Sequence, residues 1–247
     1  MPHDKLTFED FVRSIKKFEY NTDQYPFVEK LRKIFHGWTG PIENLHCFFE
    51  DSDKLQQITI EEDTKTKFHR HYYDSPYYNE FISLYYRFVK EVVLPLFKTE
   101  DDRFIVQKDP CFRIHLPNNT ALGKRTTMGD PEDKIGIHCD GEYGHPGGEI
   151  NFMVTFGNQQ GTNSCYVESS IGSEEYIPLE MKYGEFMSFY GNKLRHFNKT
   201  NNTGDARVSI DFRIIPISKY NDENNTVSLH GKRPFRVGGY YIEISRD

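Results

Sequence analysis

The chain has 247 residues, with 37 acidic and 31 basic side chains and a formal net charge of −6. Its length is typical of one domain with an ordinary hydrophobic core, and its acidic balance disfavours nucleic acid as a partner. No apolar run approaches the length of a membrane span, the N-terminus does not resemble a signal peptide, and the four cysteines show no paired spacing. We therefore expect a single cytoplasmic domain that binds neither nucleic acid nor a membrane.

The first hundred residues have the apolar spacing of amphipathic helices. Thr7 and Asp10 have the spacing of a capping box at the start of the first helix. Ser75 with Pro76 is a cap followed by a first-turn proline at the start of the third helix. Aromatic side chains recur at helical intervals, which is more typical of a core than of a ligand site. The helices are expected over three segments: 8–18, 27–35 and 75–95.

From residue 103 onward, short β-rich runs alternate with turns of glycine, asparagine and proline, the spacing of a sandwich or barrel. We therefore predict a mainly β fold with α-helices, in which a mainly helical part of 1–100 covers a β core of 103–217. Residues 218–247 form a polar extension with a late strand over 240–244. No repeat or linker divides the chain, so 1–247 is expected to be one domain.

Two histidines and one aspartate stand where predicted strands end. His138 closes the apolar run 135–138, Asp140 follows it among glycines, and His196 opens a polar loop after the strand-like run 185–190. Ligands at strand ends are held rigidly, and two imidazoles with one carboxylate form the facial triad that suits non-haem Fe(II). Each part alone is equally compatible with a loop ion pair or a hydrogen-bonded core histidine. Their positions together favour a metal site.

In the predicted strand 206–216, polar and apolar residues alternate from Arg207 to Ile214. Because successive side chains of a strand point to opposite faces, its polar residues share one face that would line a cavity: Arg207, Ser209, Asp211 and Arg213. Arg207 follows His196 by eleven residues, and its guanidinium with the Ser209 hydroxyl suits an anionic cosubstrate. A solvent-facing strand with an Asp211–Arg213 ion pair is the alternative. It accounts for the alternation but not for the spacing from His196.

Five segments resemble the Fe(II)- and 2-oxoglutarate-dependent oxygenases, and within them a bacterial subgroup described as streptomycin-biosynthesis-like: 137–140, 149–152, 166–169, 191–192 and 207–213. The likeness covers residues 111–217 and implies a double-stranded β-helix, or jelly-roll, as the core. It also implies that the iron ligands are His138, Asp140 and His196. By the same resemblance, Arg207 and Ser209 bind the distal carboxylate of 2-oxoglutarate.

The reaction that this resemblance implies uses Fe(II), 2-oxoglutarate and O₂, and releases succinate and CO₂ as a small polar metabolite is hydroxylated. An amino acid or amino sugar fits the polar strand face, but desaturation, ring closure or epimerisation would use the same residues. The alternative from another class is a cupin-like non-oxidative isomerase or small-ligand-binding protein. Asp140 and the Arg207–Ser209 pair argue against that class, in which histidine-rich metal sets are commoner.

Three further residues are candidates with open alternatives. Asp211 and Arg213 are candidate substrate-binding residues, or else a structural ion pair at the end of their strand. Arg113, on a predicted strand over 112–115, either helps to bind the cosubstrate or forms a surface ion pair. The mouth of the cavity is expected in 122–134 and 141–148, where glycines would allow closure over the substrate.

Overall fold

The computed structural model describes residues 4–49, 67–118, 135–221, 223, 226–228 and 232–246. Its helices are α1 (Phe8–Arg13), α2 (Phe27–Ile34), α3 (Lys67–Tyr73) and α4 (Tyr78–Phe88). Its strands are β1 (Lys16–Glu19), β2 (Arg103–Gln107), β3 (Cys111–His115), β4 (Ile135–His138), β5 (Ile150–Thr155), β6 (Cys165–Glu168), β7 (Tyr176–Pro178), β8 (Glu185–Phe189), β9 (His196–Asn198), β10 (Arg207–Pro216) and β11 (Tyr241–Ser245). None of the helices in these ranges is long and apolar enough to span a membrane.

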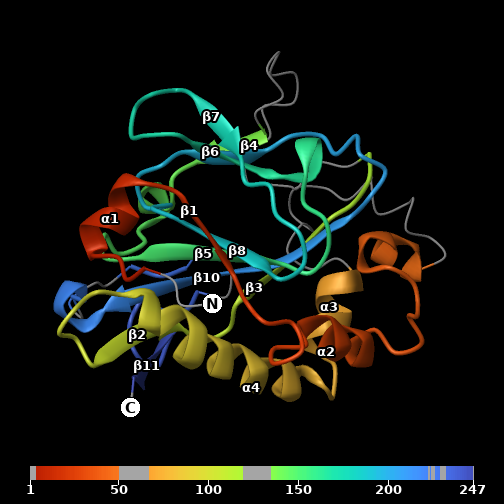
Figure 1. Cartoon of the computed structure of the whole chain (residues 1–247), viewed down its shortest axis with the longest axis horizontal. Coiled ribbons are helices and arrows are strands. Elements are labelled where there is room, and N and C mark those ends of the chain that lie inside the picture. Colours follow the sequence, from red (N-terminus) through yellow and green to blue (C-terminus); the bar gives the residue numbers. More distant parts are fainter. Residues whose placement is uncertain are drawn as a thin grey trace.

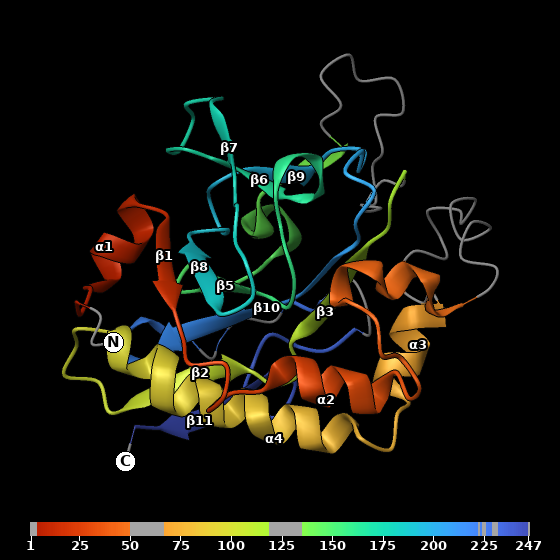
Figure 2. The ribbon, with the colours of Figure 1, turned by 45° about the vertical axis from the view of Figure 1, so that its right-hand side comes forward.

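The strands form two antiparallel sheets (Figure 1). The larger follows the order β1-β8-β5-β10-β2-β11, with β3 also paired to β10, and the smaller follows β4-β9-β6-β7. Figure 2 shows the smaller sheet and α4 on opposite sides of the larger one. The fold is therefore mainly β, with the facing antiparallel sheets of a jelly-roll-like architecture.

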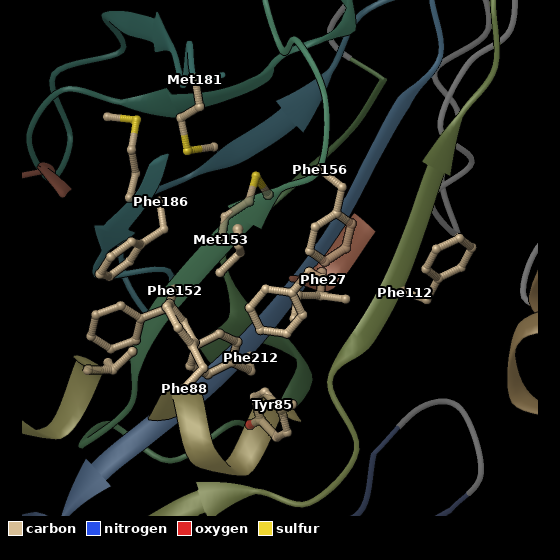
Figure 3. Packing of buried hydrophobic residues seen from close by; sticks show 14 of the residues in the cluster. Phe27, Tyr85, Phe88, Phe112, Phe152, Met153, Phe156, Met181, Phe186 and Phe212 are labelled. Carbon is tan, nitrogen blue, oxygen red and sulfur yellow. The ribbon is translucent and has the colours of Figure 1, made fainter. Parts of the chain in front are cut away.

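All ten residues of β10 are buried. Its two faces therefore differ in polarity and not in exposure to solvent. On the apolar face, Phe212 stacks on Phe152 of β5 at 5.6 Å and meets the edge of Tyr85 of α4 at 5.1 Å. Figure 3 shows these rings in a cluster with Phe88 and Phe186, and such aromatic contacts stabilise a core beyond their buried area. The other face carries the polar residues that the alternation predicted.

The N-terminal segment differs from the helix expected over 8–18. The capping box at Thr7 and Asp10 is present, but α1 ends at Arg13 and Ser14 is extended. Phe18 lies in β1, where it stacks on its register partner Phe186 at a ring distance of 5.0 Å. The apolar spacing fits a helix locally, but pairing with β8 gives Phe18 a buried position in the sheet.

Other boundaries shift less. The helix expected over 75–95 begins at Tyr78 and continues through a π-turn and a 3-10 turn to Leu96. His196 was expected to open a loop, and instead it begins β9, because this segment pairs with β4 and β6. The late strand expected over 240–244 is β11, shifted by one residue.

Candidate metal centre

His138, Asp140 and His196 come together between the ends of the smaller sheet's strands. His138 ends β4 and lies opposite His196 at the start of β9, while Asp140 begins a 3-10 turn, η6 (Asp140–Tyr143). Asp140 Oδ1 lies 3.8 Å from His138 Nε2 and 3.5 Å from His196 Nε2. One ligand atom from each residue falls within 4.8 Å of the others. The three residues selected from the sequence can therefore hold one metal ion.

Hydrogen bonds to the backbone determine which ring nitrogen of each histidine faces this point. His138 Nδ1 donates to the Gly136 carbonyl at 2.5 Å, and His196 Nδ1 donates to the Leu194 carbonyl at 3.0 Å. A carbonyl only accepts, so Nδ1 of each ring carries a proton, and Nε2 is the ring nitrogen that faces Asp140. Burial, together with the neighbouring His196, lowers the pKa of His138 to about 4. His138 is thus a neutral ligand at neutral pH.

The two oxygens of Asp140 have different environments. Oδ2 accepts hydrogen bonds from Asn151 Nδ2 at 2.7 Å and Arg213 Nη2 at 3.0 Å, which leaves Oδ1 facing the histidines. Burial alone would raise the pKa of Asp140, but the Arg213 guanidinium and His196 hold it well below its usual range. Asp140 is therefore an ionised carboxylate prepared to bind a metal through one oxygen.

A second segment, Gly191-Asn192, holds the backbone that carries Asp140. The Asp140 N–H donates to the Gly191 carbonyl at 2.8 Å, and the Gly141 N–H donates to the Asn192 carbonyl at 3.2 Å. A Cβ atom at Gly191 would lie 2.6 Å from Asn151 Nδ2, so only glycine fits there without moving Asn151. The positions of Asp140 and of Asn151, which donates a hydrogen bond to it, therefore both depend on the close approach of the Gly191 backbone.

The loop over 141–148 is tied down from several sides. Asn192 Nδ2 donates to the carbonyl of His145 at 2.9 Å, the Tyr190 hydroxyl to that of Gly147 at 2.8 Å, and the Thr226 hydroxyl to that of Gly144 at 2.7 Å. These bonds hold the loop as a wall of the site, and the closure that its glycines were expected to allow would have to break them. The other expected part of the mouth, 122–134, lies outside the described residues.

Behind this wall, Glu149 is a fully buried carboxylate. It accepts a hydrogen bond from His145 Nδ1 at 2.8 Å and another from the hydroxyl of Tyr241 in β11. His145 and Glu149 also lie near Asp140 as a second group of possible ligands, but both Glu149 oxygens already accept a hydrogen bond, from His145 and from Tyr241. Sequence reasoning set His145 aside as a fourth metal ligand and gave no role to Glu149 or Asn151. The signal for Asn151 was a polar residue within the otherwise apolar run 150–154.

Arg207 and Ser209 offer a separate polar site at the start of β10. Arg207 is 2% exposed and donates from Nη1 to the Asn163 carbonyl at 3.0 Å. Within the described ranges, its Nε and the Ser209 hydroxyl have no hydrogen-bond partner, and burial lowers the pKa of Arg207. Unpaired buried donors are costly, so these groups fit a ligand that brings acceptor oxygens. A carboxylate supplies both oxygens and the opposing charge.

The remaining polar residues form an alternating chain of ion pairs that begins at Asp140. Arg213 Nη2 contacts Asp140 at 3.0 Å and its Nη1 contacts Asp211 Oδ2 at 2.5 Å, while Arg113 Nε contacts Asp211 Oδ1 at 2.7 Å. The Asp211–Arg213 pair of the alternative interpretation is present, but its strand is buried rather than solvent-facing. Arg213, a candidate substrate-binding residue, contacts two carboxylates of the protein.

No family model matches the chain. It is 30% identical over 228 residues to the streptomycin biosynthesis protein StrG of Streptomyces griseus, covering 92% of this chain and 98% of that protein. Among solved structures, it is similar to SnoK, a non-haem α-ketoglutarate-dependent carbocyclase from nogalamycin biosynthesis, with a TM-score of 0.53, 7% identity and coverage of 98% and 100%. It is also similar to CytC3 with Fe(II) and α-ketoglutarate, at a TM-score of 0.42 and 11% identity over 97% of each chain. The sequence relative indicates the family, and the SnoK likeness supports the fold alone.

Proposed function

Since the chain belongs to the Fe(II)- and 2-oxoglutarate-dependent oxygenases, in the subgroup of StrG, we propose that it hydroxylates a small polar metabolite with release of succinate and CO₂. The observation that carries this proposal is the pairing of two sites. One is the His138, Asp140 and His196 cluster with its donor atoms facing one point, and the other is the unpaired Arg207–Ser209 site. The proposal gives each site a role, the first as the metal site and the second as the cosubstrate site.

In this proposal, His138, Asp140 and His196 hold Fe(II), whose chemistry when bound is the activation of O₂ with 2-oxoglutarate as the reductant. The protein's residues set up that site in advance. Backbone carbonyls fix the Nε2 atoms of both histidines, and Asn151 with Arg213 occupies the second oxygen of Asp140. The three residues would then supply one ligand atom each and would leave further positions on a bound Fe(II) open to other ligands.

Arg207 and Ser209 would bind the distal carboxylate of 2-oxoglutarate. The guanidinium is held by the Asn163 carbonyl, and the neighbouring Ser209 hydroxyl lies on the same face of β10. Both groups are buried and shielded from water. An entering carboxylate therefore does not have to break another hydrogen bond of Arg207 Nε or of the Ser209 hydroxyl. These observations support the proposal that the two residues selected from the sequence bind the cosubstrate.

The whole chain would act as one domain in the cytoplasm. β1, from the N-terminal part, pairs with β8, and β11, from the C-terminal extension, pairs with β2, so both extensions belong to the larger sheet. Contacts of Tyr85 and Phe88 with rings of β10 and β8 support the N-terminal helices as a cover for the outer face of that sheet.

The test measures succinate formed from 2-oxoglutarate by the purified full-length chain, with Fe(II) present or chelated, across amino acids, amino sugars and related compounds. We expect succinate release that needs Fe(II) and rises with one substrate class, and mass spectrometry of that substrate to show one added oxygen. An altered ring or stereocentre without added oxygen would assign ring closure or epimerisation. Metal binding without any 2-oxoglutarate turnover or binding would favour a cupin-like protein.

A further inference from the structure

The exposure of the three candidate ligands shows from which side the metal centre is reached. The side chain of His138 is 25% exposed, whereas those of Asp140 and His196 are 4% and 11% exposed. Among the strands that the structure describes, β4, which His138 ends, is an edge strand of the smaller sheet paired with β9, and β3 is paired with β10 of the larger sheet. Access to the centre is therefore on the side of His138.

Arg113 of β3 combines a position on the polar face with a large exposed surface. It lies opposite Ser209 in the register of β3 and β10, and 49% of its side chain is exposed. Its ion pair with Asp211, which Arg213 joins to Asp140, makes it the outer end of a chain of contacts that starts at a candidate metal ligand. Arg113 is thus a cation on the accessible side of the centre.

The ion-pair chain gives this cation a fixed direction. Asp211, itself held by Arg213, accepts from Arg113 Nε at 2.7 Å and Nη2 at 3.5 Å. A guanidinium has five N–H donors in a rigid fork, and Asp211 is the one carboxylate among the described residues that contacts it. The remaining donors are directed away from Asp211. A fixed fork with unused donors suits an oxyanion.

The cosubstrate does not need this group. Arg207 and Ser209 already provide a buried carboxylate site with unused donors, whereas Arg113 is half exposed and neutralised on one side by Asp211. A group bound at Arg113 would lie on the solvent side of the centre, where a substrate enters.

We propose that Arg113 is the specificity residue for the substrate, and that the substrate carries an oxyanion group, a carboxylate or a phosphate ester, which the outer donors of Arg113 bind. The proposal rests on the proposed function, whose substrate class it narrows. Asp211 and Arg213 act through Arg113 and are positioning residues for it.

The test has a turnover arm and a binding arm. Turnover uses matched compounds that differ only in the anion: amino acids against their amino alcohols, and amino sugars against their phosphate esters. We expect only anionic members to stimulate succinate release, with carboxylates and phosphates compared to identify the group. Arg113→Gln should raise KM for the active compound by about 10- to 100-fold, the range for one charge-assisted contact, and Arg113→Lys should give a smaller rise.

The control variant is Arg103→Gln, because Arg103 is also half exposed (50%) and paired with a carboxylate, Glu243, but lies on β2 away from the centre. It should leave unchanged the KM for the active compound and the KM for 2-oxoglutarate. The binding arm uses metal-free Arg207→Ala protein, which lacks the other proposed carboxylate site, and measures the binding of methyl phosphate and acetate by ligand-observed NMR. In this background we expect a binding signal that Arg113→Gln loses and Arg103→Gln keeps. This arm needs neither iron nor 2-oxoglutarate, so it can succeed where the proposed function fails.

Three results would overturn the proposal. The first is stimulation by neutral members of the matched pairs that is as strong as by anionic ones. The second is a larger rise in KM for 2-oxoglutarate than for the active compound in Arg113→Gln, which would assign Arg113 to the cosubstrate. The third is a parallel loss of Mn(II) affinity, which would mean that Arg113 supports only the Asp140 end of the ion-pair chain.

Discussion

Replacing Arg213 with methionine removes the cation that separates two buried carboxylates while keeping much of the side-chain volume. The side chains of Asp140 and Asp211 are 4% and 7% exposed, and both contact Arg213. Removing one partner of a buried ion pair typically costs roughly 3–5 kcal/mol, because the other charge stays buried without compensation. For a domain of this size, 1 kcal/mol shifts Tm by about 2–4 °C, so we expect the metal-free Arg213→Met protein to melt roughly 6–20 °C lower.

The assay is thermal and urea unfolding of metal-free protein, followed by circular dichroism. Arg103→Met is the matched control, because the exposed Arg103–Glu243 pair is worth at most about 1 kcal/mol. A double variant with Asp140→Asn should lose less than the sum of the two single losses, because the residues contact each other. If Arg213→Met is no less stable than Arg103→Met, the two carboxylates do not depend on Arg213, and the reasoning from burial is wrong.

Four further outcomes are expected at the two sites. His196→Ala should bind no Fe(II) and release no succinate, while its circular dichroism spectrum stays that of a folded protein. Isothermal titration with Mn(II) measures metal binding, and an affinity equal to that of the wild type would contradict the assignment. Arg207→Ala should weaken 2-oxoglutarate binding by roughly 3–5 kcal/mol, and Ser209→Ala by about 1 kcal/mol, as measured by KM; equal effects would refute the ion pair as the main contact. The pKa of His138 is about 4 in the folded protein and about 6.5 in the unfolded chain. Its contribution to stability is therefore present above pH 6.5 and is lost as pH falls toward 4. In a plot of the urea unfolding midpoint against pH, His138→Gln should reduce the slope between these two values. Glu149→Gln should lower Mn(II) affinity by about 10-fold, the lower end for outer-shell partners, because the His145 contact behind Asp140 loses its acceptor charge; unchanged affinity would limit Glu149 to a role in folding.

The sequence by itself determined the features that depend on local order. The alternation over 206–216 predicted both faces of β10, the spacing of Thr7 and Asp10 predicted the cap of α1, and the positions of the two histidines and Asp140 at strand ends predicted a metal cluster. Each of these follows from the periodicity of a strand or helix, or from the metal-binding chemistry of the side chains. Both can be recognised from the residue types within a short stretch of sequence.

Only the tertiary structure decided which charged and polar side chains contact each other. Arg213 and Asp140 are 73 residues apart in the chain, and nothing local distinguishes their contact from a contact of Arg213 with a substrate. The same holds for Asn151, for the pinned loop over 141–148, and for Phe18, whose spacing fits a helix but whose buried place is in a sheet. Such contacts form only when packing excludes water from particular pairs of distant segments, because burial makes each polar group depend on the partner that the fold brings to it.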